Sequence, residues 1–117
     1  MEFRDTVRAF VRDEVKPVAT SSRRLEPFAK PLLMEQLNAA SNMGLRALLL
    51  SEANGGAGAD NHSACIVCEA LGEGDADIAV VMAHTAVLAT TLIDGAMSVE
   101  QRGRYAAQFN EIGRAHV

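Results

Sequence analysis

The chain has 117 residues, which favours a single domain, and 49% of them are hydrophobic while only 4% are aromatic. Its core must therefore be built from aliphatic side chains and methionine. A net charge of −4 excludes a basic stripe for nucleic acid, and the pair Arg23-Arg24 is too short to form a polybasic patch. The two cysteines and the missing signal-peptide pattern favour a reducing, cytoplasmic location.

The first half of the chain predicts two amphipathic helices. Residues 1–16 place apolar side chains on one face, and Pro17 is expected to end that helix. Residues 31–43 form the second helix, which Gly44 ends in the left-handed conformation while Leu45 folds back on the last turn. The apolar run 46–50 is either a strand or a buried turn, because periodicity does not separate the two.

The second half predicts three further helices. One begins near Asp60 or Asn61, runs to about residue 71 and ends at two glycines, 72 and 74. The next is capped by Asp75 or Asp77 and covers residues 78–93, which are apolar on nearly every side. We therefore expect a central, buried helix, too short for a membrane span. A capping box, Ser98 with Gln101, opens a last helix through Phe109, and the predicted fold is all-α with about five helices.

The glycine-rich stretch SEANGGAGADN, residues 51–61, is a candidate phosphate loop. A Walker loop requires a lysine after its last glycine, and none follows here. The dinucleotide fingerprint requires a third glycine, which is missing after Gly56 and Gly58. A tight turn that needs positive φ is the favoured interpretation.

Other candidate chemical groups form no complete set. Cys65 and Cys68 make a CxxC pair, and His62 and His84 are able to complete it as a metal site. No second cysteine pair is present, and nothing in the spacing demands such a site. Packing of both thiols in the core is therefore favoured, and no metal is expected. His84 and Thr85 interrupt the apolar helix, where a hydrogen-bonded core histidine is favoured over a pocket wall. The acidic residues at 69, 73, 75 and 77 are typical of helix caps, and no catalytic set is predicted in this chain.

Several stretches, taken in order, resemble the N-terminal domain of the acyl-CoA dehydrogenase family. GLRALLLSEANGGAGAD, from Gly44, is similar to that family's glycine-ended helix, apolar run and GGxG turn. FRDTVRAF from Phe3, EAL and DAD from Glu69 and Asp75, and MAHT from Met82 follow in the family's order. The helix with Gly95, Glu100-Gln101-Arg102 and Tyr105 closes the match, which covers about residues 1–110 as one domain.

This resemblance implies a function for the parent protein. In that family, FAD oxidises an acyl-CoA thioester to its α,β-enoyl form, while a carboxylate removes the α-proton. The base and most of the FAD site lie in later domains, so the resemblance implies an inactive fragment, no assigned cofactor-binding residues, and a homo-oligomeric parent. It also implies that the segment 78–93 forms part of the wall around the acyl chain, and the residues expected to line it are Met82, His84, Thr85, Leu88, Ala89 and Leu92.

Two departures and one tail qualify the resemblance. Ser51 stands where the family usually has proline, and Asn54 where an aromatic residue is common. Residues 111–117, EIGRAHV, resemble a translated short-read sequencing adapter, so we expect a non-native tail; a genuine polar tail is the alternative. The alternative function is a stand-alone helical module that binds a protein partner.

Overall fold

The computed structural model describes residues 2–21 and 32–112, and this part of the chain is helical without any strand. It confirms the predicted all-α class. The predicted helix start at Pro31, the pair Arg23-Arg24 and residues 113–117 lie outside the described residues. The elements in chain order are α1 (Glu2–Phe10), η1 (Val11–Val15), α2 (Lys16–Ala19), α3 (Met34–Asn42), η2 (Glu52–Asn54), α4 (Asn61–Gly74), α5 (Ala76–Ala89), η3 (Thr90–Ala96) and α6 (Val99–Ile112).

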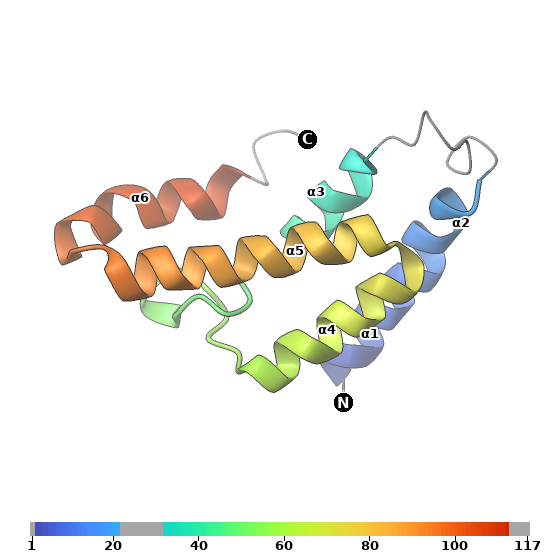
Figure 1. The fold of residues 1–117 in the computed structure, drawn as a ribbon, viewed down its shortest axis with the longest axis horizontal. Coiled ribbons are helices and arrows are strands. Elements are labelled where there is room, and N and C mark those ends of the chain that lie inside the picture. The colour runs from blue at the N-terminus through green and yellow to red at the C-terminus, as the bar shows by residue number, and fades with distance from the viewer. Residues whose placement is uncertain (1, 22–31, 113–117) are drawn as a thin grey trace.

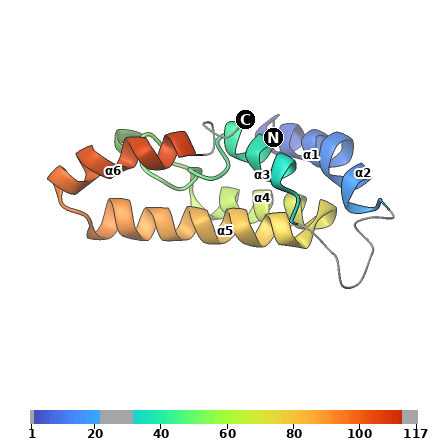
Figure 2. The ribbon, with the colours of Figure 1, turned by 90° about the horizontal axis from the view of Figure 1, so that it is seen from above.

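The longest helical stretch, α5 with η3, runs along the length of the molecule (Figure 1). α4 ends where α5 begins, and the chain reverses its direction between the two helices. α1 packs against α4. Seen from above, α5 and α4 lie along one side of the molecule, and α1, α2, α3 and α6 lie on the opposite side (Figure 2). The molecule is flat, with principal extents of 48 × 32 × 21 Å.

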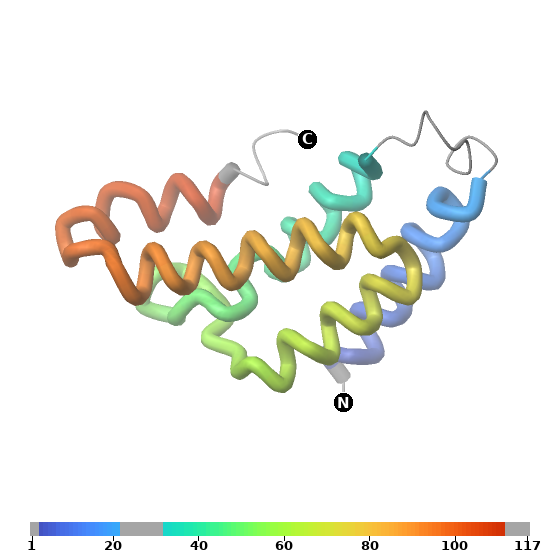
Figure 3. Tube along the Cα trace, in the orientation of Figure 1, coloured from blue at the N-terminus to red at the C-terminus, as the bar shows by residue number. Residues whose placement is uncertain are grey.

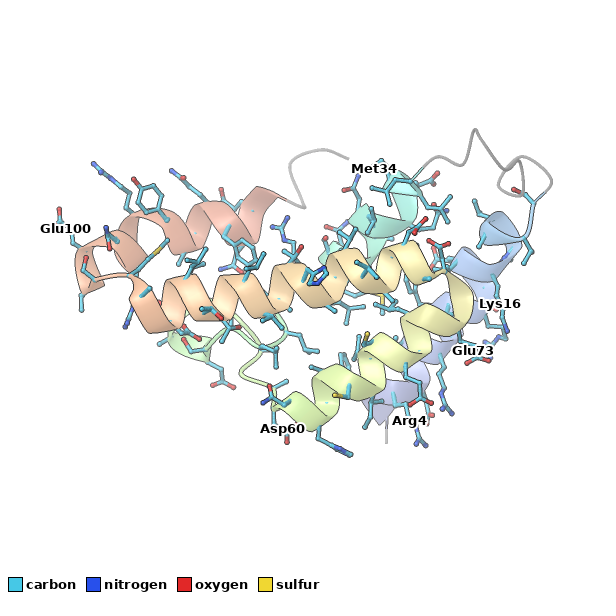
Figure 4. The ribbon with its side chains drawn as sticks, viewed as in Figure 1. Arg4, Lys16, Met34, Asp60, Glu73 and Glu100 are labelled. Carbon is cyan, nitrogen blue, oxygen red and sulfur yellow. The ribbon has the colours of Figure 1, made fainter. Side chains whose placement is uncertain are left out.

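Pro17 does not end the first helix, contrary to the sequence-based prediction. The helix passes through the π-helical turn η1 and continues as α2 to Ala19, with Pro17 in the first turn of α2. The N–H of Lys16 bonds the carbonyl of Val11, which is the wide i to i+5 pattern. Such a wide turn makes room for the proline ring and accommodates its missing N–H, which explains the continuation. The end of this helix is tied to α4 by an ion pair from Lys16 Nζ to Glu73 Oε1 at 3.6 Å (Figure 4).

The predicted cap at the end of α3 is confirmed. Gly44 has φ +88°, its N–H bonds the carbonyl of Ser41, and the N–H of Leu45 bonds the carbonyl of Ala40. These two bonds are the Schellman pattern, and the side chain of Leu45 is buried as expected.

The N-terminal caps of the later helices are also confirmed. Asp60 accepts a bond from the N–H of Ser63 at 2.8 Å, and Asp75 accepts one from the N–H of Ile78 at 3.2 Å. α4 passes through the glycine at 72 and ends at the one at 74, so only the second glycine ends it. The capping box is reciprocal: Ser98 N–H bonds Gln101 Oε1 at 2.9 Å, and Gln101 N–H bonds Ser98 Oγ at 3.2 Å.

The segment between α3 and α4 is a buried turn and not a strand. Leu48 and Leu50 are buried, and the chain folds back so that the N–H of Ala59 bonds Leu48 and that of Gly58 bonds Leu50. The trace runs from α3 toward the C-terminal half of α5 before it returns to the start of α4 (Figure 3). This path brings the segment beside η3 and α6.

The apolar interior is divided into two clusters. The larger one joins α1, η1, α3, α4 and the first half of α5, and it includes Val7, Leu37, Leu71 and Ile78. The smaller one consists of Leu50, Ala89, Ile93 and Ala106, with Phe109 packed against it. α5 with η3 contributes to both clusters and so connects the two halves of the fold.

The prediction that residues 78–93 form a helix buried on every side is wrong for the described chain. One stripe of α5 and η3 is buried, but Val80, Leu88 and Leu92 are more than half exposed. Periodicity shows only that every side is apolar; it does not show which sides another element covers. The length argument against a membrane span is also wrong, because Ala76–Ala96 has 21 residues and is apolar enough to cross a membrane by length and composition. Core helices of soluble proteins meet the same criterion, so this measure does not place the helix in a membrane.

Candidate functional site

An apolar groove lies between α4, α5 and the turn after α3. Its volume is about 270 Å³. The groove is lined by Leu45, Leu48, Leu49, Asn61, Ala64, Cys65, Val67, Cys68, Leu71, Met82, Ala83, Ala86 and Val87. Asn61 is the only side chain of these with an amide, so the groove offers an apolar surface with two thiols and few directional hydrogen bonds.

A second surface lies on the solvent side of α5 and η3, and we call it the open face. It consists of the exposed side chains Val80, His84, Val87, Leu88 and Leu92. Four of these are aliphatic and are between 51% and 58% exposed. The spacing of four between Val80, His84, Leu88 and Leu92 places them along one helical stripe. In the view from above, no described helix covers this side of α5 (Figure 2).

The six residues predicted to line the acyl chain do not share one surface. His84, Leu88 and Leu92 lie on the open face. Met82 is buried and lines the groove, and Ala89 is buried in the smaller cluster. Thr85 is half-buried, and its hydroxyl donates to the carbonyl of Val81 at 2.7 Å. Val80 and Val87 also lie on the open face but were not among the six predicted residues. Val80 stands four residues before His84, so the helical period places the two on one stripe.

Two expectations about polar and thiol groups are wrong. His84 was expected to be a hydrogen-bonded core histidine, but it is exposed on the open face. Both cysteines were expected to pack in the core, but Cys65 is exposed and only Cys68 packs against the larger cluster. His84 faces a side of α5 that no other described helix covers, whereas Cys65 lines a groove that is open to solvent.

A polar cluster holds the glycine-rich turn against η3. Asp94 accepts bonds from the N–H of Ser51 at 2.9 Å, from the Ser51 hydroxyl at 2.8 Å and from the Asn54 amide at 2.7 Å. The backbone carbonyl of Asp94 accepts a bond from the Arg102 guanidinium at 2.8 Å. Burial raises the pKa of Asp94, but the bonds from Asn54 and Ser51 and the charge of Arg102 outweigh it, and the net pKa lies below its ordinary value. Sequence spacing gives no signal for this contact, since 43 residues separate Ser51 from Asp94.

The two residues that depart from the resemblance are those that build this cluster. Asn54 also accepts, through its backbone carbonyl, a bond from the Asn110 side chain at 2.9 Å. Proline at position 51 has neither the N–H nor the hydroxyl that Asp94 accepts. The chain therefore fixes this turn with polar bonds of its own.

Comparison with known families identifies the family of this chain. Residues 1–111 match the family described as "Acyl-CoA dehydrogenase, N-terminal domain". The match covers nearly the whole chain, so the chain belongs to the acyl-CoA dehydrogenase N-terminal domain family. Comparisons with curated proteins and with solved structures gave no match.

The glycine-rich turn does not form a cradle for the pyrophosphate of FAD, the cofactor that this family implies. The pyrophosphate of a dinucleotide needs backbone N–H groups that point at it. In the glycine-rich turn, the N–H groups of Gly55, Gly56 and Gly58 bond the carbonyls of Glu52, Ser51 and Leu50. The N–H of Ala57 likewise bonds the carbonyl of Ala47 and that of Ala59 bonds Leu48, so the N–H groups from Gly55 to Ala59 are all used within the fold, and this part of the stretch serves as a structural turn.

The described residues also show no group of three or more His, Cys, Asp and Glu side chains placed to hold a metal ion. His62 and His84, the two histidines considered as partners of the CxxC pair, therefore form no such cluster with it.

Proposed function

We propose that this chain is the N-terminal helical part of a flavin-dependent acyl-CoA dehydrogenase, whose parent oxidises acyl-CoA thioesters to α,β-enoyl-CoA. The family membership over residues 1–111 carries this proposal. In this proposal, the base and most of the FAD site belong to other parts of the parent, as the resemblance implies. A cytoplasmic, homo-oligomeric parent that uses FAD is part of the same proposal.

The contribution of this chain is one wall of the acyl site. The open face of α5 supports that role, because a fatty acyl chain requires an extended apolar surface and makes few polar demands. His84, Leu88 and Leu92 contact the acyl chain in this proposal, together with Val80 and Val87. Met82 and Ala89 lie beneath the wall and hold it in place by packing, and the bonded Thr85 lies at its border.

The experiment that tests the parent function is to sequence the native gene across the codon for Asn110. A reading frame that continues into a β-domain with flavin-contacting residues and a later carboxylate base supports the proposal. A natural stop codon after Val117 contradicts it, and the proposed tail of residues 111–117 is decided by the same sequence.

The wall itself is tested by titrating the isotope-labelled chain with dodecanoyl-CoA and following backbone amide shifts by NMR. We expect shifts at His84, Leu88 and Leu92, and weaker binding in Leu88→Ser. Val99→Ser is the matched control, because Val99 is 83% exposed on α6, away from the open face. Equal weakening in both variants, or shifts confined to α6, contradicts the assignment of the wall.

The second candidate is a stand-alone helical module that binds a protein partner. The exposed aliphatic side chains of the open face favour it, because contiguous exposed apolar patches mark interaction surfaces. The gene sequence separates the two candidates, since only this one is compatible with a stop codon after Val117.

A further inference from the structure

The CxxC pair lies at the groove and has no part in the proposed acyl wall. Cys65 and Cys68 are free thiols on α4, and both line the groove between α4 and α5. Cys65 is exposed and Cys68 is half-buried, so one thiol is open to solvent and the other reaches the apolar interior. A residue and its third neighbour lie on the same side of a helix, so the two thiols face the same space.

Helix geometry argues against a disulfide between them. Side chains at i and i+3 on a helix have Cβ atoms about 5–6 Å apart. A disulfide requires Cβ atoms about 3.5–4.5 Å apart. α4 is a continuous helix over Asn61–Gly74, held at its start by the Asp60 cap, so closing the disulfide requires this turn to distort. A single pyramidal bridging atom with bonds of about 2.3 Å to each sulfur holds the two sulfurs roughly 3.4 Å apart, whereas a disulfide brings them to about 2.05 Å, so the bridged form distorts the turn less.

The surroundings decide which kind of atom fits. A structural zinc site requires four ligands, and no third His, Cys, Asp or Glu joins the thiols in the described part of the chain. Two thiolates suit a soft, thiophilic centre that carries its remaining substituent itself. The apolar lining next to the thiols suits a hydrocarbon substituent, and about 270 Å³ exceeds the roughly 150 Å³ of a protein cavity that holds benzene.

We propose that Cys65 and Cys68 form a dithiol site for monosubstituted arsenic(III) compounds, with the organic substituent seated in the groove between α4 and α5. The reaction is a condensation without oxidation or reduction. An arsenoxide, R–As=O, and two thiols give R–As(S–Cys)₂ and one water; both S–H bonds break, two As–S bonds form, and the two protons leave with the oxygen. The acyl wall on the open face shares Val87 with the lining of the groove but contains neither thiol, so tests at the two cysteines are independent of it.

The test treats the full chain with phenylarsine oxide and measures the adduct by intact mass. We expect one arsenic per chain, retained in excess glutathione and removed by 2,3-dimercaptopropanol, because a monothiol does not compete with two sulfurs on one helix. Cys65→Ser and Cys68→Ser each leave one thiol and should lose the adduct in glutathione. Cys65 is exposed, so Cys65→Ser keeps the fold, which circular dichroism checks. Equal retention in the parent and in Cys65→Ser overturns the proposal.

The groove is tested separately with a smaller substituent. Phenylarsine oxide should bind at least tenfold more tightly than its methyl counterpart. Ala83→Leu narrows the groove while both cysteines are kept. It should remove the preference for the phenyl compound while binding of the methyl compound persists. Tighter binding of the methyl compound to the parent, or a phenyl preference unchanged in Ala83→Leu, contradicts the seating of the substituent in the groove.

Discussion

At the scale of single residues, the helix ends that carry a local cap were predictable, whereas the continuation past Pro17 and the distant contacts were not. Gly44, Asp60, Asp75 and the Ser98 box are decided by neighbours within a few positions, so local chemistry is sufficient to predict them. The hydrogen bonds of Asp94 are made to Ser51 and Asn54, which lie far from it in the sequence. No periodicity in the sequence indicates this contact. The same limit applies to His84, whose exposure depends on which side of α5 remains uncovered.

Asp94 gives the residue-scale prediction, which concerns pH. Its pKa in the folded chain lies below its ordinary value because of the bonds from Asn54 and Ser51 and the charge of Arg102, despite the opposing effect of burial. Its contribution to stability is therefore complete above the unfolded value of about 3.9 and is lost as pH falls through the lower folded value. Asp94→Asn should thus be less stable than the parent at pH 7, and the difference should shrink at pH 3.

Urea unfolding at the two pH values measures this difference. Glu69→Gln removes an exposed carboxylate from α4 and serves as the charge-matched control. A stability difference for Asp94→Asn that is the same at both pH values is incompatible with the ionised cluster.

At the scale of elements, the sequence predicted which helices exist but not how closely they approach. The crossing of α4 with η1 depends on Gly74, where an added Cβ lies 2.6 Å from Val11 Cγ1 and 3.0 Å from Val15 Cγ1. From the sequence, Gly74 was predicted only to end a helix. Gly74 also lets α4 approach η1 closely, and this role depends on Val11 and Val15 near the other end of the chain.

Gly74→Ala should therefore destabilise the fold by about 1–3 kcal/mol, the usual cost of forcing extra volume into a packed contact. Gly103→Ala is the control, because α6 leaves nothing within 4 Å of an added Cβ there. That substitution should stabilise α6 by up to about 1 kcal/mol through helix propensity. Urea unfolding midpoints measure both changes, and a Gly74→Ala variant as stable as Gly103→Ala would count against this crossing.

At the scale of the whole molecule, the fold is more extended than a self-sufficient domain of its length. The radius of gyration is 14.8 Å, against roughly 13 Å for a compact chain of this size. The open face accounts for part of this shape, because α5 lies at one side with its aliphatic stripe uncovered (Figure 2). The sequence alone could not distinguish an apolar helix that is buried on every side from an apolar helix with one exposed face.

Self-association through the open face is the prediction at this scale. Leu88→Glu should shift the chain toward monomer in sedimentation velocity runs, while the free energy of unfolding changes by no more than about 0.5 kcal/mol because Leu88 is exposed. Val99→Glu adds the same charge on α6 and should leave the sedimentation profile of the parent unchanged. If the two variants sediment alike, the open face does not drive association.

The division of the interior into two clusters has a consequence for how the folded chain opens. The smaller cluster has few members. α6 meets the rest of the molecule through this cluster, the bonds to Asp94 and Asn54, and the Arg46 guanidinium, which donates to the Phe109 carbonyl and lies over its ring. α6 can then detach as a cooperative unit while α1, α4 and the first half of α5 stay folded. Hydrogen–deuterium exchange should accordingly show two protection classes, with the amides of α6 exchanging well before those around Leu71 and Ile78. A native population with α6 detached would present the protease-sensitive form of this molecule, long before global unfolding.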